Sequence, residues 1–258
     1  WQKNLLINNL KKIDLFTNDV NFLNIIKKKY KILNLFTEKK NLLNTKNQKY
    51  FKVFWVKNFL KIKKYITSSD FALCYSFGLI IKEELIKSYS EGIWNIHPGD
   101  LPKYRGRHPI TAAFLNNEKK IGVCVHSINR NIDMGVLLSK TYIKREYFDD
   151  EQTILKKVLK KIPSLLNAAS INKKNKKGKI LTKGSYHKPF YRGIRIDDSK
   201  KFEHIFIHNA AKSQKIHGGI FVNNKKYYDS YFYNYKNLKK KKSEIILCKN
   251  NKKLILIK

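Results

Sequence analysis

The chain has 258 residues, 42% of them hydrophobic, so it can bury a core as one large domain or as a domain with a small appendage. No apolar run approaches the roughly 18 residues that a membrane span requires, and no charged-then-apolar leader is visible. We therefore expect a soluble cytoplasmic protein with no membrane partner. The first residue is Trp1 and not Met, which is typical of a processed or fragmentary chain.

The formal net charge is +36 at pH 7. Clustered basic residues bind nucleic acid by displacing counterions from phosphates. Here, however, lysines are spread through nearly every segment, which is typical of a solvated basic surface, and phosphate-reading sites favour arginine. The charge alone therefore does not predict a nucleic-acid partner. The arginines are Arg105, Arg107, Arg130, Arg145, Arg192 and Arg195.

The N-terminal third alternates short apolar runs with amphipathic ones. Residues 70–75 are apolar on both faces, as in a central parallel strand, and Ser76-Phe77-Gly78 ends that run. Strands that alternate with helices predict an α/β fold with a mostly parallel sheet. We expect strands at residues 13–16, 31–36, 51–56 and 70–75, helices within 17–29, 59–66 and 82–88, and a loop at 38–49.

The middle of the chain carries the clearest motifs. Residues 92–96 predict a strand, and the loop at 97–108 contains Pro98, Gly99, Pro102 and Gly106. Pro109 favours a helix start, so we expect a helix at 109–116. Further on we expect strands at 122–128 and 136–143, joined by a turn at 129–135, and an amphipathic helix at 151–166.

The C-terminal part begins after a stretch rich in Lys, Asn and Gly at residues 172–179, the best candidate for a linker. We expect a Rossmann-like catalytic domain at residues 1–178 and a small β-rich domain at 179–258. Within the second domain, the pattern predicts a helix at 202–211 and strands within 220–232, 244–248 and 254–257.

Three polar residues are candidates for chemistry. His97 follows a strand and precedes a loop, so its imidazole is expected at the carboxyl end of that strand, where open α/β sheets bind ligands. Asn95 lies two residues earlier, on the same face. Asp133 lies in the turn between two later strands. An amide, an imidazole and a carboxylate together suit acyl transfer to an amine, with Asn95 holding the oxyanion and His97 and Asp133 handling protons.

The sequence around these residues resembles that of the 10-formyltetrahydrofolate-dependent formyltransferases. Residues 95–109 (Asn-Ile-His-Pro-Gly-Asp-Leu-Pro-Lys-Tyr-Arg-Gly-Arg-His-Pro) are similar to the signature loop of that family. Residues 122–126 (Gly-Val-Cys-Val-His) and 132–135 (Ile-Asp-Met-Gly) fall where the family has a Gly-Val-Thr strand and an Asp-x-Gly turn. Residues 75–81 resemble its folate-lining loop. The resemblance is strong over residues 69–138 and weak in the flanks.

The resemblance implies roles for particular residues. Asn95, His97 and Asp133 match the family's catalytic set, and 10-formyltetrahydrofolate is the implied formyl donor, with no metal. Gly99-Asp100, Met134 and Val136 depart from the family pattern and place the local folate and substrate contacts in question. Matched to the folate pocket are Phe77, Gly78, Leu79, Ile80, Ile81, Asn129, Arg130, Asn131 and Ile132; matched to acceptor binding are Lys103, Arg105, Gly106 and Arg107.

Other polar and aromatic residues have simpler interpretations. His126, on an alternating strand, is expected to be a structural histidine. His204 and His208 have helical spacing but lack a third metal ligand. The Tyr227–Tyr235 cluster, which could stack on bases, is expected to form the core of the β-rich module. The cysteines Cys74, Cys124 and Cys248 are far apart and predict buried, reduced thiols.

The acceptor is less constrained than the reaction. The motif at residues 103–109 looks closest to sugar-amine formyltransferases, and the C-terminal tail resembles that of sugar-amine and methionyl-tRNA enzymes. We therefore expect the primary amine of a nucleotide-linked amino sugar, and a homodimer is compatible with this. The alternatives are methionyl-tRNA, favoured by the positive charge, and a non-catalytic relative that binds folate or nucleic acid.

Overall fold

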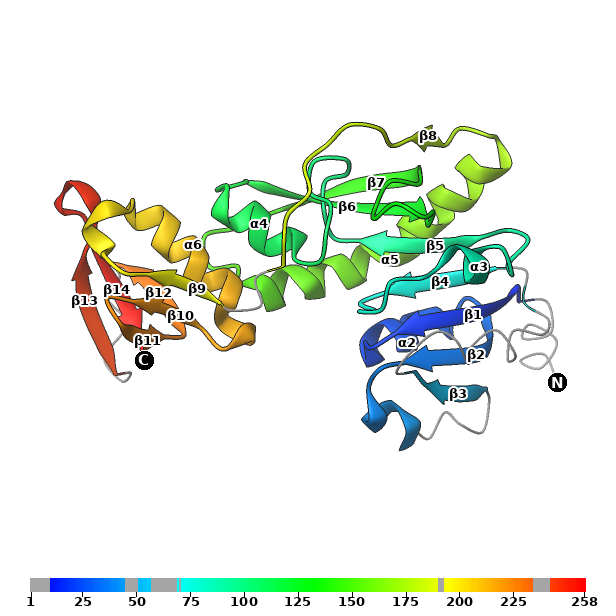
Figure 1. The fold of residues 1–258 in the computed structure, drawn as a ribbon, viewed down its shortest axis with the longest axis horizontal. Helices are drawn as coiled ribbons and strands as arrows, with labels where there is room; N and C mark the ends of the chain where they lie inside the picture. Colours follow the sequence, from blue (N-terminus) through cyan, green and yellow to red (C-terminus); the bar gives the residue numbers. More distant parts are fainter. Residues whose placement is uncertain (1–9, 45–50, 57–68, 70, 190–192, 234–241) are drawn as a thin grey trace. The chain divides into compact units, whose positions relative to one another are not determined.

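A computed structural model describes residues 10–44, 51–56, 69, 71–189, 193–233 and 242–258. Its main feature is an eight-stranded sheet with the order β3-β2-β1-β4-β5-β6-β7-β8 (Figure 1). The five strands from β3 to β5 are parallel, β6 is antiparallel to β5, and β8 is antiparallel to β7. This order confirms the predicted Rossmann-like α/β fold. The strands are β1 (Lys12–Thr17), β2 (Lys31–Thr37), β3 (Lys52–Trp55), β4 (Ala72–Tyr75), β5 (Ile93–His97), β6 (Lys120–Ser127), β7 (Val136–Lys144) and β8 (Lys179–Ile180).

The helices of this part mostly begin and end near the predicted residues. Helix α2 starts where the Asp19 carboxylate accepts a hydrogen bond from the Phe22 backbone N–H at 2.9 Å, an N-cap. The helix predicted at residues 59–66 lies outside the described residues. The remaining elements are η1 (Lys40–Asn44), α2 (Val20–Ile26), α3 (Glu83–Ile86), α4 (Pro109–Leu115) and α5 (Glu151–Lys174).

The segment expected to be a linker, residues 172–179, is largely part of the fold. Helix α5 continues to Lys174, where Lys173 and Lys174 favour the negative end of the helix dipole. The Asn172 side chain donates a hydrogen bond to the Leu138 carbonyl at 2.7 Å, which keeps a polar residue on the helix. Residues 179–180 then pair with β7. The Lys, Asn and Gly content of residues 172–179 therefore does not mark a linker, because these polar residues belong mainly to the end of a helix and to a short strand.

The interior of the parallel sheet is apolar, with one acidic exception. Asp14 is fully buried on β1 and accepts hydrogen bonds from the Asn34 amide and the Tyr89 hydroxyl, both at 2.9 Å. Burial raises the pKa of the Asp14 carboxyl, which these hydrogen bonds only partly offset. The strands around it are otherwise nearly continuous runs of buried apolar side chains, as expected for a sheet covered on both faces.

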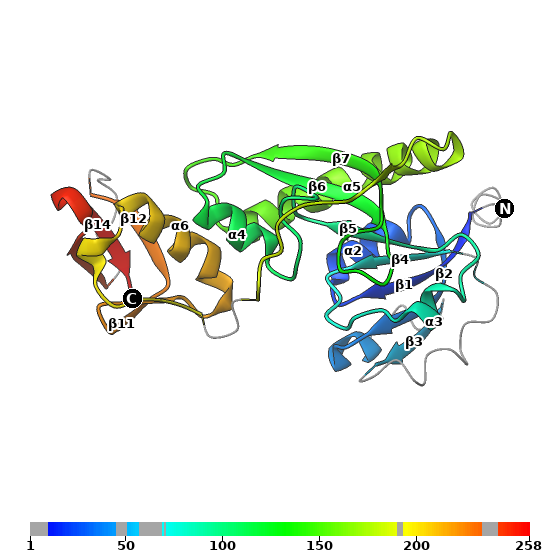
Figure 2. The same ribbon diagram turned by 45° about the horizontal axis from the view of Figure 1, so that its top comes forward.

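The C-terminal module consists of two small sheets and one helix, and its core joins all three. Figure 2 shows α6 (His204–Gln214) beside β12 and β14. Ile207, Ala210 and Ala211 of α6 are buried against apolar residues of both sheets, including Tyr227. The sheet orders are β11-β10-β9 and β12-β14-β13. Further elements are β9 (Ile194–Ile196), η5 (Ser199–Lys201), η6 (Lys215–His217), β10 (Ile220–Val222), β11 (Lys225–Tyr227), β12 (Asp229–Phe232), β13 (Ser243–Leu247), η7 (Lys249–Asn251) and β14 (Lys253–Ile257).

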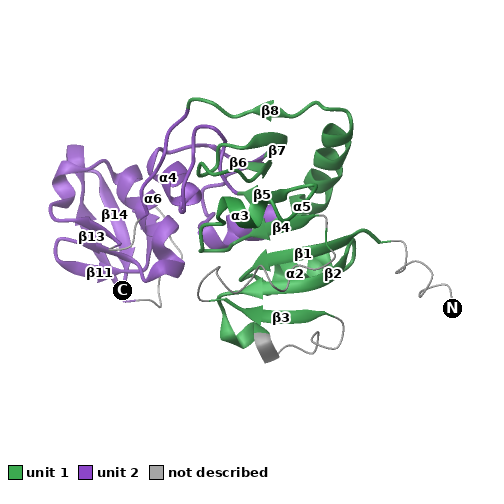
Figure 3. Ribbon diagram, turned by 45° about the vertical axis from the view of Figure 1, so that its right-hand side comes forward, with its two compact units in different colours: residues 1–97, 123–141, 159–183 green, residues 98–122, 142–158, 184–258 purple. Residues whose placement is uncertain are grey.

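The chain divides into two compact units, coloured separately in Figure 3. Unit 1 consists of residues 1–97, 123–141 and 159–183, and unit 2 of residues 98–122, 142–158 and 184–258. Unit 1 holds the parallel sheet, whereas unit 2 holds α4, α6 and the C-terminal sheets. The domain boundary that we expect after residue 178 stays a prediction.

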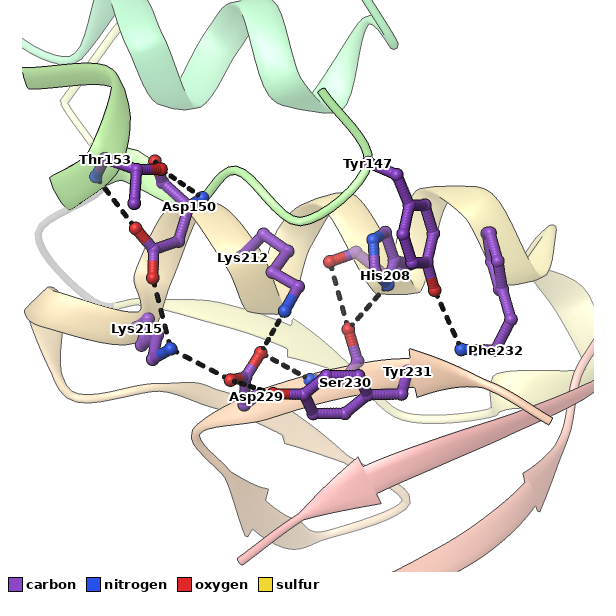
Figure 4. Close-up of polar contacts among 10 residues, drawn as sticks. All are labelled: Tyr147, Asp150, Thr153, His208, Lys212, Lys215, Asp229, Ser230, Tyr231 and Phe232. Atoms are coloured by element: carbon purple, nitrogen blue, oxygen red, sulfur yellow. Dashed lines mark hydrogen bonds and ion pairs between the residues drawn. The ribbon is translucent and has the colours of Figure 1, made fainter. Parts of the chain in front are cut away.

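A buried polar network fastens α6 to β12 within unit 2 (Figure 4). The Lys212 ammonium lies 2.7 Å from the Asp229 carboxylate, and both side chains are almost fully buried. Lys215 bridges Asp229, at 2.9 Å, and Asp150, at 3.1 Å. Burial by itself would raise the pKa of the Asp229 carboxyl, but the hydrogen bonds from Lys212, Lys215 and the Ser230 backbone, together with the charge of Lys212, outweigh it and the net pKa is lowered. The carboxylate is therefore held in its charged form.

His208 lies in the same region and is neutral for a physical reason. Its ring stacks on Tyr147, at 4.9 Å, and on Phe232, at 4.8 Å, two rings that also contact each other, and its Nδ1 lies 3.0 Å from the Ser230 hydroxyl (Figure 4). Burial, and then the charge of Lys212, lowers the pKa of His208 to about 4. This histidine belongs to the core of the module.

Candidate active site

Two of the three predicted catalytic residues come from the end of one parallel strand. Asn95 and His97 alternate on β5, so their side chains share a face of the sheet. His97 is the last residue of the strand and is 4% exposed. The carboxyl ends of parallel strands are where such sheets bind ligands. The structure therefore places Asn95 and His97 as the sequence predicts.

Asp133 completes the predicted set from the turn between β6 and β7. Its carboxylate Oδ2 lies 3.8 Å from His97 Nδ1, and its side chain is 11% exposed. At this distance the two groups form a close electrostatic contact and not a hydrogen bond. Catalytic contacts are often long before substrate binds and shorten in the complex. Asn95, His97 and Asp133 therefore lie in one part of unit 1.

The backbone of the turn explains how Asp133 is presented. Asp133 adopts a left-handed conformation with φ of 52°, which Asp tolerates better than most residues. Asn129 supports the turn by donating to the Met134 carbonyl at 3.1 Å. A Cβ atom on Gly135 would meet the Ser127 carbonyl oxygen at 1.7 Å, so only glycine fits at this position.

His126, which we expect to be a structural histidine, is buried next to the predicted set and contacts Asn95, which the sequence does not indicate. It faces Asn95 directly across the antiparallel β5–β6 pair. Its Nε2 lies 3.2 Å from Asn95 Nδ2 and 3.4 Å from Asp133 Oδ1. His126 is only 1% exposed, so it is the inner member of the cluster. The alternation of residues 122–128 places His126 on a buried face, but only the pairing of β6 with β5 brings it to Asn95.

The hydrogen bonds of His126 define its tautomer. Its Nδ1 lies 2.9 Å from the Ser127 carbonyl, which can only accept, so Nδ1 carries the proton. In the neutral imidazole, Nε2 then presents a lone pair to the Asn95 amide N–H. One N–H of that amide is thereby fixed, and the second is oriented by the same bond. His126 therefore orients the Asn95 carboxamide.

The first segment matched to a folate pocket borders an apolar core cluster of unit 1 that includes Phe16. Phe77 and Leu79 pack against this core, Ile81 is a buried member of it, and Ile128, just before the second matched segment, also packs against it. The Gly78 backbone N–H donates to the Glu38 carboxylate, which also accepts from Asn18 at 2.7 Å. The neighbouring apolar side chains Ile80 and Ile132 are 67% and 43% exposed.

A buried thiol lies beside Asn95 on the sheet. Cys74 is the β4 residue paired with Asn95. Burial, and then the negative charges of Asp133 and Glu38, raises the pKa of the Cys74 thiol. The Cys74 thiol is therefore protonated and inert. Burial, and then the charge of Glu203, raises the pKa of the Cys248 thiol to about 11, and Cys124 is also a buried free cysteine.

The predicted acceptor-binding residues lie on a loop of unit 2. The Lys103 ammonium pairs with the Glu118 carboxylate, and Arg107 is exposed. Gly106 has φ of 108°, and a Cβ there would meet the His187 carbonyl oxygen at 2.4 Å. One guanidinium nitrogen of Arg105 donates to the Gly184 carbonyl at 3.0 Å. Their roles in acceptor binding stay predictions, and the contacts of Arg105 and Gly106 are internal ones.

In the described part of the chain, no three His, Cys, Asp or Glu side chains are arranged to hold a metal ion. Among the helices of that part, none is both long and apolar enough to cross a membrane.

The fold and the cluster define a class: a Rossmann-like α/β protein with amide, imidazole and carboxylate groups at the end of a parallel strand. Residues 29–169, more than half of the chain, match the model of the formyl transferase family. The chain belongs to this family, as the motifs around Asn95 and Asp133 indicated.

Similar proteins include formyltransferases with different acceptors. Methionyl-tRNA formyltransferase of Borreliella burgdorferi is 37% identical over 97 residues, which are 38% of this chain and 31% of that protein. The match thus spans about a third of the relative. The structure of WlaRD, a sugar 3N-formyl transferase with dTDP and 5-N-formyl-THF, aligns with a TM-score of 0.70 at 20% identity, covering 96% of this chain and 98% of that one.

A second solved structure aligns over a similar share of both chains. The N-formyltransferase of Helicobacter canadensis, in complex with folinic acid and dTDP-3-aminofucose, aligns with a TM-score of 0.65 at 18% identity. The alignment covers 96% of this chain and 99% of that one. At these identities the likeness concerns the fold, which therefore extends through both units and the C-terminal module.

Proposed function

We propose that the chain transfers a formyl group from 10-formyltetrahydrofolate to the primary amine of a nucleotide-linked amino sugar. The observation that carries this proposal is the cluster of Asn95, His97, His126 and Asp133 at the carboxyl end of β5. It combines a hydrogen-bond donor for an oxyanion with two groups that exchange protons, which is what acyl transfer to an amine requires.

Each side chain has a task in this reaction. The acceptor nitrogen forms a bond to the formyl carbon, and the bond from that carbon to the donor nitrogen breaks. The Asn95 amide, oriented by His126, donates to the oxygen on which negative charge develops. His97 donates to the same oxygen or passes a proton to the leaving nitrogen, and Asp133 accepts the proton that the amine loses.

The residues around the cluster fit a folate donor. The donor, when bound, supplies the formyl carbon in an activated amide. Ile80 and Ile132 offer exposed apolar side chains that suit the flat face of a pterin, and they flank backbone segments that suit its polar edge. Glu38 holds the Gly78 backbone N–H, so the first of these segments is fixed before any ligand binds.

A sugar acceptor is favoured by the extent of structural similarity. The two sugar N-formyltransferase alignments cover nearly all of this chain and of the other proteins, C-terminal module included. The loop motif at residues 103–109 supports the same acceptor class. The test is incubation of the purified chain with the folate donor and a panel of nucleotide-linked amino sugars, with the formylated sugar detected by mass spectrometry.

Methionyl-tRNA formylation is the second candidate, favoured by the net charge of +36 and by the curated relative that is 37% identical over 97 residues. Filter binding with initiator tRNA separates the two. Tight, salt-sensitive binding together with a formylated aminoacyl-tRNA product would replace the sugar proposal. A non-catalytic relative would bind the donor without product in either assay.

A further inference from the structure

A short segment before the C-terminal module pairs with the predicted acceptor loop. We call residues Gly184–His187 the tether segment, because the chain reaches β9 through it. The Arg105 backbone N–H donates to the Ser185 carbonyl at 3.1 Å, and the His187 backbone N–H donates to the Arg105 carbonyl at 2.9 Å. Arg105 and Tyr186 thus form a parallel β-bridge within unit 2.

Two glycines make this close approach possible. A Cβ atom on Gly184 would lie 2.0 Å from the Pro102 carbonyl oxygen, and one on Gly106 would lie 2.4 Å from the His187 carbonyl oxygen. Both obstacles are backbone atoms, so no side chain can move aside to make room. The tether segment and the loop are therefore built to lie against each other.

The neighbouring residue Tyr104 is held on two sides. The His187 ring stacks on its ring with centroids 5.1 Å apart. On the other side, the Tyr104 hydroxyl donates to the Glu118 carboxylate at 2.7 Å and accepts from the Asn116 amide at 3.1 Å. Tyr104 is 2% exposed, so the loop is anchored through a buried aromatic ring.

The Arg105 side chain, like its backbone, contacts the tether segment. One terminal nitrogen of its guanidinium donates to the Gly184 carbonyl at 3.0 Å, and its Nε is buried without a hydrogen-bond partner among the described residues. The bond to Gly184 uses one of the five N–H groups of the guanidinium and ties the side chain to the tether segment.

We propose that the tether segment is a positioning element for acceptor binding, and that Arg105 is a positioning residue that ties the loop to this segment. The inference rests on the proposed function, because the loop matters only if an acceptor binds there. Its consequence is that the segment leading into the C-terminal module sets the geometry of the acceptor loop. Loosening the pairing is expected to weaken acceptor binding and to spare the donor.

The experiment compares His187→Pro, His187→Ala and the control Lys183→Pro in the full chain. Proline removes the N–H that bonds the Arg105 carbonyl, alanine removes only the ring that stacks on Tyr104, and Lys183 is an exposed residue just before the tether segment. Hydrogen exchange of the Arg105 amide reports on the pairing without substrate. Steady-state kinetics give KM for the acceptor and the donor, and kcat.

We expect His187→Pro to raise exchange at Arg105 and the acceptor KM about 10-fold each, with donor KM and kcat nearly unchanged. His187→Ala, which keeps the backbone pairing and serves if the proline variant fails to fold, should raise the acceptor KM about 3-fold. Lys183→Pro should resemble the wild type. A wild-type acceptor KM in both His187 variants would overturn the proposal. Absence of formyl transfer by the wild-type chain would instead refute the proposed function, and the positioning role with it.

Discussion

His126 and Asn95 face each other across the β5–β6 pair, with 3.2 Å between the imidazole Nε2 and the amide Nδ2. The bond orients the carboxamide that is proposed to hold the oxyanion. The two residues are 31 positions apart in the chain. The donor of the oxyanion site is therefore set by a neighbouring strand and not by β5 alone.

Replacing His126 by phenylalanine is expected to lower kcat without changing either KM. Phenylalanine keeps a ring of similar size but offers no lone pair to Asn95, so the amide is free to rotate out of position. We expect kcat to fall about 100-fold, as for loss or misplacement of one oxyanion donor. Initial rates of formyl transfer at saturating donor and acceptor measure kcat. His204→Phe, in the C-terminal module, is the control, and equal activities of the two variants would contradict the assignment.

The turn that presents Asp133 provides a second prediction. Gly135→Ala places a Cβ atom against the Ser127 carbonyl, so the backbone around Asp133 must shift. Because a shift of about 1 Å in a catalytic group can cost 100-fold, we expect kcat to fall by about that factor. Gly178→Ala is the control, since the one close approach of its Cβ, at 2.4 Å, is to a Val136 side-chain atom, which can rotate. If both variants retain full kcat, the position of Asp133 does not matter to the reaction.

The buried histidine of the C-terminal module predicts a dependence of stability on pH. The pKa of His208 is lowered to about 4 in the folded chain from its ordinary 6.5. The unfolded chain therefore binds more protons between these values, so the contribution of His208 is complete above pH 6.5 and is lost as pH falls to 4. The loss is about 3 kcal/mol in the free energy of unfolding.

Denaturant titrations from pH 7 to pH 4 measure this slope. In His208→Gln, the free energy of unfolding should be lower at pH 7 but should fall less on acidification than in the wild type. His217, whose pKa is raised chiefly by its hydrogen bond to Glu151, contributes with the opposite sign in both proteins and so cancels in the comparison. Parallel curves for the two proteins would show that His208 does not titrate in this range.

The buried Lys212–Asp229 pair predicts that neutralising the acid lowers the free energy of unfolding more than neutralising the base. Asp229→Asn leaves the buried Lys212 ammonium without its anion, which is expected to cost about 3 to 5 kcal/mol. Lys212→Met should cost less, because Asp229 keeps its 2.9 Å contact with Lys215 and the backbone N–H of Ser230. Denaturant unfolding of both variants gives the two values. The reverse order would mean that Lys215 does not compensate the carboxylate.

Much of the fold and part of the site could be predicted from local patterns. Alternating apolar and amphipathic runs give the strands and helices around β1 to β5, and the period of two along β5 places Asn95 and His97 on one face. Asp133 followed from a turn with Gly135. The positions of these residues depend on neighbours close together in the chain, whereas their catalytic roles are implied by the resemblance of residues 95–109 and 132–135 to the formyltransferases and stay predictions.

The rest depends on which strands and segments pair. His126 reaches Asn95 only because β6 lies next to β5, and no local pattern specifies that neighbour. The tether segment meets Arg105 from 79 residues away, a contact that the sequence does not indicate. The Lys212–Asp229 pair joins a helix to a strand 17 residues further on, and no local pattern specifies it. These contacts could not be predicted from composition, because they depend on pairing between distant segments of the chain.

Formyl transfer by the wild-type chain and by His97→Ala is the most direct test of the central claim. Purified protein is incubated with 10-formyltetrahydrofolate and the nucleotide-linked amino sugar that the panel identifies, and product is followed over time. We predict formylated sugar with the wild type and a rate at least about 100-fold lower with His97→Ala, at unchanged fold by circular dichroism. Equal rates for the two proteins would contradict the account of this site.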